Sequence, residues 1–103
     1  MIFYIILEEG DLMYKLLIVE DDFIIAKGLQ KHFEKYHYDV QYIEDFEHVL
    51  DEFLEFQPDL VLLDIHLPFF DGYYWCQEIR KISQIPIVFI SSANENMNIV
   101  LAM

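Results

Sequence analysis

Short apolar runs recur along the chain at intervals that suit the strands of a sheet. Three of them, over 15–19, 60–63 and 86–90, are apolar at nearly every position. Such runs are typical of central strands in a parallel sheet that helices cover on both faces. A shorter run over 40–43 predicts a fourth strand.

The segments between these runs have the periodicity of helices. Apolar residues recur every three or four positions over 23–36, 46–54 and 73–82, which predicts three amphipathic helices. A last helix is predicted to begin at Asn94 or Glu95 and to continue to the end of the sequence. Strands that alternate with helices through short connections indicate an α/β fold, in which a mainly parallel sheet is doubly wound.

The first twelve residues do not follow this pattern. An apolar run over 1–7 is followed by Glu8-Glu-Gly10, and Met13 then opens the first predicted strand. Glu-Glu-Gly can be encoded by purine-rich codons that resemble a bacterial ribosome-binding site a short distance before a start codon. We therefore expect residues 1–12 to be a non-native or leader extension and 13–103 to form one domain. The alternative is an additional strand or N-terminal arm.

Composition and charge narrow the classes of function. With 103 residues and 55% apolar content, the chain can bury one core. Its 19 acidic against 6 basic side chains give a net charge of −13, which repels nucleic-acid phosphates and anionic lipid. It lacks the run of roughly 18 apolar residues that spanning a membrane requires. The single Cys76 excludes an internal disulfide, which suits the reducing cytoplasm. Together with the negative charge, this leads us to expect a cytoplasmic domain that binds neither nucleic acid nor membrane.

Acidic and hydroxyl residues follow three of the predicted strands. These are Glu20-Asp-Asp22, Asp64 and Ser91-Ser92. Ligands of doubly wound sheets bind beyond the carboxyl ends of the strands, where these residues would meet. Carboxylates about 4 Å apart repel by about 4 kcal/mol per pair at an effective dielectric constant near 20, and Mg²⁺ would offset that repulsion. A carboxylate held beside Mg²⁺ can attack a phosphoryl donor and form an acyl phosphate.

Each acidic segment also has a purely structural explanation. Residues 20–22 could be a solvated loop that caps the helix beginning at Phe23. Asp64 could be a turn residue ahead of Pro68. The placement of all three segments at strand ends favours a functional cluster.

Three motifs resemble receiver domains of two-component response regulators, over the stretch from Tyr14 to Met103. They are Leu17-Ile-Val-Glu-Asp-Asp22, Leu60-Val-Leu-Leu-Asp-Ile-His-Leu-Pro-Phe-Phe-Asp-Gly72 and Pro86-Ile-Val-Phe-Ile-Ser-Ser-Ala93. The resemblance implies the flavodoxin-like receiver fold. Within that family the sequence looks most similar to winged-helix transcriptional regulators of resistance to bacitracin and other antimicrobial peptides.

The resemblance also implies roles for the acidic residues. Asp64 matches the aspartate that is phosphorylated. Glu20 and Asp21 match the acidic pair that binds Mg²⁺ together with it, and Asp22 is their neighbour. His66 matches the position whose backbone carbonyl completes the metal site, and its side chain should border the phosphoryl group.

The C-terminal part of the family pattern is incomplete. Ser92, before Ala93, matches the switch hydroxyl, with Ser91 as the alternative by a slip of one residue. The family's fifth strand, the lysine after it and the fifth helix have no counterpart, since the last basic residue is Lys81. This truncation implies slow phosphorylation and an open apolar edge at 87–90 that could form a homodimer or another edge-strand association.

The resemblance implies a phosphoacceptor rather than an enzyme, with at most self-phosphotransfer and self-dephosphorylation. A sensor histidine kinase would phosphorylate Asp64 in a Mg²⁺-dependent reaction, and a DNA-binding domain absent from this chain would regulate transcription. The alternative is a pseudo-receiver, an interaction module without competent phosphotransfer because the lysine is missing. The aromatic segments 69–70 and 73–75 would fill the core or, alternatively, form a partner-docking surface.

Overall fold

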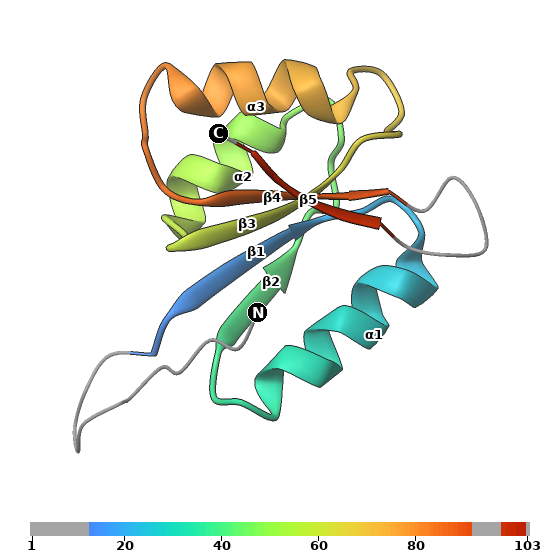
Figure 1. The fold of residues 1–103 in the computed structure, drawn as a ribbon, viewed down its shortest axis with the longest axis vertical. Coiled ribbons are helices and arrows are strands. Elements are labelled where there is room, and N and C mark those ends of the chain that lie inside the picture. Colours follow the sequence, from blue (N-terminus) through green and yellow to red (C-terminus); the bar gives the residue numbers. More distant parts are fainter. Residues whose placement is uncertain (1–12, 92–97, 103) are drawn as a thin grey trace.

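The computed structural model describes residues 13–91 and 98–102, which form one sheet with helices on both faces (Figure 1). The elements in chain order are β1 (Lys15–Val19), α1 (Phe23–Glu34), β2 (Asp39–Tyr42), α2 (Val49–Phe56), β3 (Leu60–Asp64), α3 (Gly72–Arg80), β4 (Ile87–Ser91) and β5 (Asn98–Ala102).

The strand order in the sheet is β2-β1-β3-β4-β5, and the first four strands are parallel. The order reverses direction at β1, because β2 lies on one side of it and β3 on the other. Helix α1 covers one face of the sheet, and α2 and α3 cover the opposite face (Figure 1). The predicted doubly wound parallel sheet is therefore confirmed.

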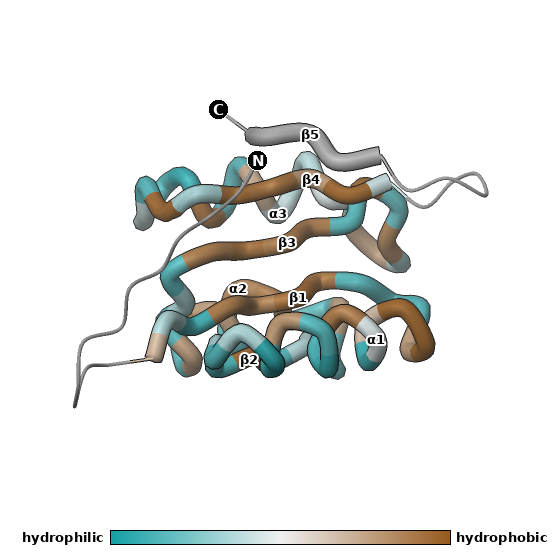
Figure 2. The backbone as a smooth tube through the Cα atoms, turned by 60° about the horizontal axis from the view of Figure 1, so that its bottom comes forward, coloured by the Kyte–Doolittle hydropathy of each residue, from teal (hydrophilic) through white to brown (hydrophobic). Residues whose placement is uncertain are grey.

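The central strands are apolar along most of their length, as Figure 2 shows for β1, β3 and β4. Successive side chains point to opposite faces, so each strand supplies two cores. One core lies against α2 and α3, and the other lies against α1. The first contains Leu17, Val19, Val61, Leu63, Phe53, Trp75 and Ile79, and the second contains Leu16, Ile18, Ala26, Val40 and Leu62.

Most predicted boundaries are correct to within two or three residues. The predicted helix over 23–36 ends at Glu34, since the chain turns back at His37, and Tyr36 is exposed. The helix predicted over 73–82 begins one residue earlier and ends at Arg80. The strand predicted over 40–43 instead spans Asp39–Tyr42.

The C-terminal prediction is wrong. Residues 98–102, which were assigned to a helix beginning at Asn94 or Glu95, form strand β5 instead. This strand pairs antiparallel with β4, and Ile87 lies opposite Ala102. The edge of β4 is therefore covered, not open as predicted. The backbone groups of an apolar edge strand favour a further strand, and this tertiary pairing outweighs local helical spacing.

None of the helices in the described ranges is long and apolar enough to cross a membrane. The proposed leader, residues 1–12, lies outside the described residues.

Candidate functional site

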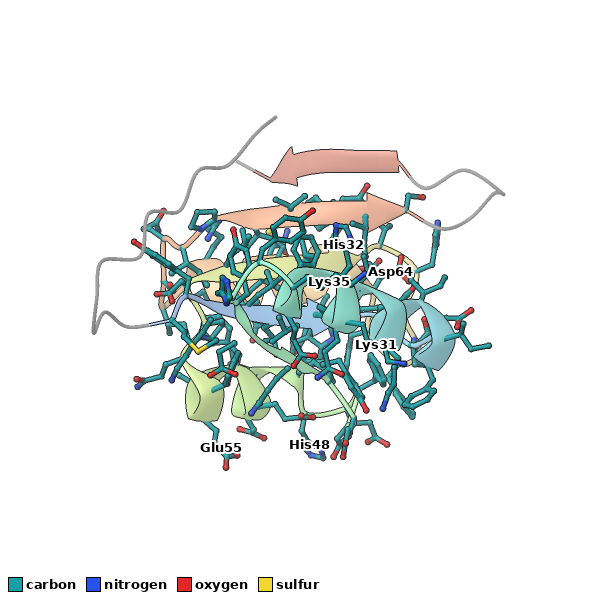
Figure 3. All side chains as sticks on the ribbon, turned by 90° about the horizontal axis from the view of Figure 1, so that it is seen from below. Lys31, His32, Lys35, His48, Glu55 and Asp64 are labelled. Atoms are coloured by element: carbon teal, nitrogen blue, oxygen red, sulfur yellow. The ribbon has the colours of Figure 1, made fainter. Side chains whose placement is uncertain are left out.

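Asp64 is the last residue of β3, at the end of the sheet where the parallel strands terminate (Figure 3). The three residues before it are buried in the sheet, and Asp64 itself is only 1% exposed. It is paired in register with Ile90 of β4, so neighbouring strands enclose it on the sheet. A carboxylate that a central strand holds in this way has few accessible positions.

Glu20 and Asp21 complete a group of three carboxylates with Asp64. They follow β1, the strand next to β3, and one carboxylate oxygen from each residue lies within 4.8 Å of the others. Glu20 is 2% exposed, whereas Asp21 is on the surface. The structure therefore brings together three of the acidic residues that the sequence singles out.

The crowding of these carboxylates changes the protonation of Glu20. Burial, followed by a hydrogen bond to Asp64 and the charges of Asp64 and Asp21, raises the pKa of Glu20 to about 9. A protonated Glu20 removes one of three like charges from the cluster at neutral pH. This is the compensation that a carboxylate cluster needs when no cation is bound.

An all-oxygen donor set of this size fits a small, hard divalent cation. Mg²⁺ is bound in proteins through a few carboxylates, water and phosphoryl oxygens. The group has two buried members and one at the surface, so solvent and an incoming ligand can reach one side of it. Glu20, Asp21 and Asp64 are the described residues that could hold such an ion.

Asp22 has a structural role beside the site. Its side chain caps α1 by accepting hydrogen bonds from the backbone N–H groups of Ile24, at 3.0 Å, and Ile25, at 3.3 Å. The capping explanation offered for residues 20–22 is thus correct for Asp22. Glu20 is buried, so the same segment is not a solvated loop throughout.

The loop from β3 to α3 is closed at its base. The backbone N–H of His66 donates to Asp64 Oδ1 at 3.2 Å, and the N–H of Gly72 donates to the carbonyl of Ile65 at 2.9 Å. A Cβ atom at Gly72 would lie 2.3 Å from the carbonyl oxygen of Asp64. Gly72 therefore allows the start of α3 to approach the backbone of Asp64 closely, a role that the sequence analysis missed although an Asp-Gly pair before a helix signals it.

The His66 imidazole is exposed on this loop. Its predicted contribution to the metal site, a backbone carbonyl, remains a prediction. Ser91 ends β4 one position beyond Ile90, and it is partly buried. Ser92 and Ala93, the predicted switch positions, lie outside the described residues.

A cavity adjoins the acidic group on the side of α1. It has a volume of about 290 Å³, and its lining includes Glu20, Asp21, Phe23, Tyr42 and Phe46. Phe23 and Tyr42, which both line it, also meet edge to face, with ring centroids 5.8 Å apart. Glu20 and Asp21 of the acidic group therefore border this cavity, whereas Asp64 is not part of its lining.

The aromatic segment after Asp64 does not fill the core as predicted. Trp75 is buried at 4% exposure, but Phe69, Phe70, Tyr73 and Tyr74 are 69, 43, 54 and 37% exposed. Phe70 stacks on Tyr74 with centroids 4.3 Å apart. These four exposed residues, which we call the aromatic surface, lie in the loop that begins at Asp64 and in the first turn of α3.

A doubly wound sheet with a group of carboxylates beyond its carboxyl edge defines the class of α/β proteins that bind ligands at the strand ends. Comparison with known proteins gives the family within that class. Residues 16–103 match the response regulator receiver domain, and the chain belongs to this family.

Individual relatives agree with this assignment. The chain is 53% identical over 90 residues to the uncharacterized transcriptional regulatory protein YvcP of Bacillus subtilis, covering 87% of this chain and 38% of that protein. It is similar to the solved N-terminal domain of the nisin resistance regulator NsrR, with 47% identity and a TM-score of 0.72, covering 82% of this chain and 72% of that one. It is also similar, at 29% identity and a TM-score of 0.72, to a chain in the complex of histidine kinase ThkA with response regulator TrrA, covering 80% of this chain and 72% of that one.

The chain is thus a receiver domain of the two-component response regulators, with a relative that is named a transcriptional regulatory protein. It spans about two fifths of the length of the curated relative described above.

Proposed function

We propose that this chain accepts a phosphoryl group on Asp64 from the phosphohistidine of a sensor histidine kinase. One Asp64 carboxylate oxygen would attack phosphorus, the bond from phosphorus to the histidine nitrogen would break, and the imidazole would leave. The acidic group supports this function, because Asp64 ends a central strand and one carboxylate oxygen each of Glu20 and Asp21 lies within 4.8 Å of an Asp64 carboxylate oxygen. The ThkA–TrrA complex supports this kind of partner.

Glu20, Asp21 and Asp64 would hold Mg²⁺, with the backbone carbonyl of His66 as a further ligand. Such an ion would supply positive charge that screens the carboxylates from the approaching phosphoryl group. Glu20 would lose its proton when the ion binds. Ser92, or Ser91 by a slip of one residue, would donate a hydrogen bond to a phosphoryl oxygen, and Ala93 would leave room beside it.

The phosphorylated domain would act as a cytoplasmic signal carrier and not as an enzyme that turns over a separate substrate. A DNA-binding domain elsewhere in the whole regulator would carry the effect to transcription, as the name of YvcP supports. Residues 1–12 would be a leader extension of the domain over 13–103.

Intact-mass analysis after incubation with Mg²⁺ and acetyl phosphate tests the proposal. The wild-type chain should gain one phosphoryl group, and Asp64→Asn should gain none. Asp51→Asn is the matched control, since it makes the same chemical change at an exposed residue of α2, on the face of the sheet away from α1, and should be labelled like wild type. A folded wild-type chain that gains no mass would refute phosphoacceptance and favour the pseudo-receiver.

A further inference from the structure

Phe69 has a backbone conformation that L-amino acids avoid. Its φ angle is 68°, and the N–H of Phe70 donates to the carbonyl of Pro68 at 2.9 Å across it. A hydrogen bond from residue i+2 to residue i around a central positive φ defines the rarer and strained type of γ-turn. Glycine adopts this conformation without a steric penalty.

The other two non-glycine residues with positive φ in the described ranges have an ordinary explanation. His37 follows α1 and Gln57 ends α2, where a left-handed residue commonly terminates a helix. Phe69 terminates no helix. Its turn lies in the middle of the loop between β3 and α3, so its strain needs a separate cause.

The ring of Phe69 gains little inside the described fold. It is 69% exposed, and no described aromatic ring contacts it, whereas Phe70 packs on both Tyr74 and Trp75. An apolar side chain that is both solvent-exposed and held by a strained backbone has two unfavourable contributions. Backbone strain of this kind concentrates at functional sites.

The position of Phe69 limits which partner it can meet. It is five residues from Asp64, which corresponds to no more than about 17 Å of extended chain. The bond between Gly72 and Ile65 closes the loop at its base and keeps Phe69 near the carboxyl edge of the sheet. Any protein that brings a phosphohistidine to Asp64 must approach this same edge.

We propose that Phe69 is a docking residue for the protein that donates the phosphoryl group to Asp64. The phosphohistidine-bearing partner would place an apolar patch beside its histidine against the Phe69 ring, and the remainder of the aromatic surface would extend that contact. This proposal rests on the proposed function and adds the residue that selects the partner. Buried aromatic anchors account for much of the affinity of protein interfaces.

The test separates docking from the chemistry at Asp64. Each purified histidine kinase of the native host is incubated with ATP and the full chain, and the rate of phosphotransfer is measured for the fastest kinase. Phe69→Ala should lower that rate by about tenfold or more, as loss of an interface anchor does. Labelling by acetyl phosphate should be unchanged, since that small donor needs no docking surface. Phe69→Tyr, which keeps the ring, should retain the kinase rate.

Two glycine substitutions at separate positions distinguish the effect of losing the Phe69 ring from the effect of relieving backbone strain. Phe69→Gly and His37→Gly both relax a φ of 68°, and both should raise the melting temperature. His37 lies before β2, at the opposite end of the sheet from Asp64, so only Phe69→Gly should slow transfer from the kinase.

Three results would overturn the docking role. The first is an equal kinase rate for wild type and Phe69→Ala. The second is transfer from no host kinase to a wild-type chain that acetyl phosphate labels normally. The third is conversion of an oligomer to a monomer by Phe69→Ala with no change in transfer, which would assign the ring to a second copy. Failure of acetyl phosphate to label the wild-type chain would instead refute the proposed function itself.

Discussion

Replacing Gly72 by alanine tests how closely α3 must approach the end of β3. The new Cβ would lie 2.3 Å from the carbonyl oxygen of Asp64 and 3.0 Å from both the Asp64 carbonyl carbon and the Cα of Ile65. Carbon–oxygen contacts in proteins are seldom shorter than about 3.3 Å, so the helix and the strand must separate by about 1 Å. All three neighbouring atoms belong to the backbone, so no side-chain rotation can relieve the overlap.

The magnitude follows from two contributions. Overpacking of this kind costs about 1–3 kcal/mol, and weakening the bond from the Gly72 N–H to the Ile65 carbonyl costs about 1 kcal/mol. The gain from replacing glycine at the first position of a helix is smaller. We therefore expect Gly72→Ala to lower the free energy of unfolding by about 2–3 kcal/mol, which lowers the melting temperature of a domain of this size by roughly 10 °C.

Gly28 provides the matched control. It lies within α1, and a Cβ there would meet no atom within 4 Å. Gly28→Ala should therefore stabilise the chain by about 0.5–1 kcal/mol through helix propensity alone. Urea denaturation followed by circular dichroism measures both variants. A Gly72→Ala variant as stable as wild type would refute the expected overlap, because α3 and β3 would then be free to separate without cost.

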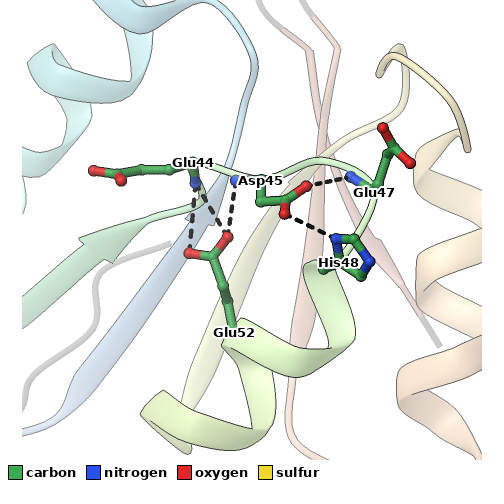
Figure 4. A network of polar contacts seen from close by, with 5 residues as sticks. All are labelled: Glu44, Asp45, Glu47, His48 and Glu52. Atoms are coloured by element: carbon green, nitrogen blue, oxygen red, sulfur yellow. Dashed lines mark hydrogen bonds and ion pairs between the residues drawn. The ribbon is translucent and has the colours of Figure 1, made fainter.

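Three further outcomes are expected. Asp22→Ala should destabilise the chain by about 1 kcal/mol in urea denaturation, through the loss of the cap of α1, and Asp22→Asn should retain most of that stability. In the β2–α2 loop, where Asp45 accepts from His48 Nδ1 at 2.8 Å (Figure 4), the pKa of His48 is raised and that of Asp45 is lowered, chiefly by this hydrogen bond. The contact is lost as pH falls through the Asp45 pKa or rises through the His48 pKa; NMR titration of Asp45→Asn should therefore show a lower His48 pKa, and an unchanged value would contradict the contact. Because the pKa of Glu20 is raised to about 9 in the metal-free fold, this carboxyl ionises at a lower pH in the unfolded chain than in the folded one, so the free energy of unfolding should fall as pH rises from about 5 to 9. Glu20→Gln should remove most of that dependence, and a steep dependence that remains in the variant would assign it to another group.

The sheet and the acidic group could be predicted because their signals are local. An apolar run such as that over 60–63 is buried on both faces wherever it is placed, and an acidic residue directly after it must lie at the strand end. Parallel pairing of β1 with β3 then brings Glu20 and Asp21 to Asp64 without further information. The same reasoning explains why the parallel strand boundaries are accurate.

The remaining features depend on contacts that the sequence does not encode locally. Strand β5 forms because β4 offers a free edge, although the spacing of its residues favours a helix. The exposure of Phe69 depends on the γ-turn, which no pattern of apolar residues indicates. The cap at Asp22 was predictable in kind, but the raised pKa of Glu20 depends on a depth of burial that only the fold determines.

Rigidity at Asp64 and exposure at Phe69 have a common structural origin. The loop after β3 is fixed at its start by the bond from the Ile65 N–H to the Ile90 carbonyl, and at its end by the close contact of Gly72. Asp71 fixes the same end again by accepting from the Tyr74 N–H at 2.9 Å. With both ends held, the chain must reverse within the few residues between them, and the reversal falls on Phe69. The closure that holds Asp64 in place therefore also turns an aromatic ring outward beside it. Under the proposed function, one loop would provide both a fixed phosphoacceptor and an exposed surface for the protein that brings the phosphoryl group.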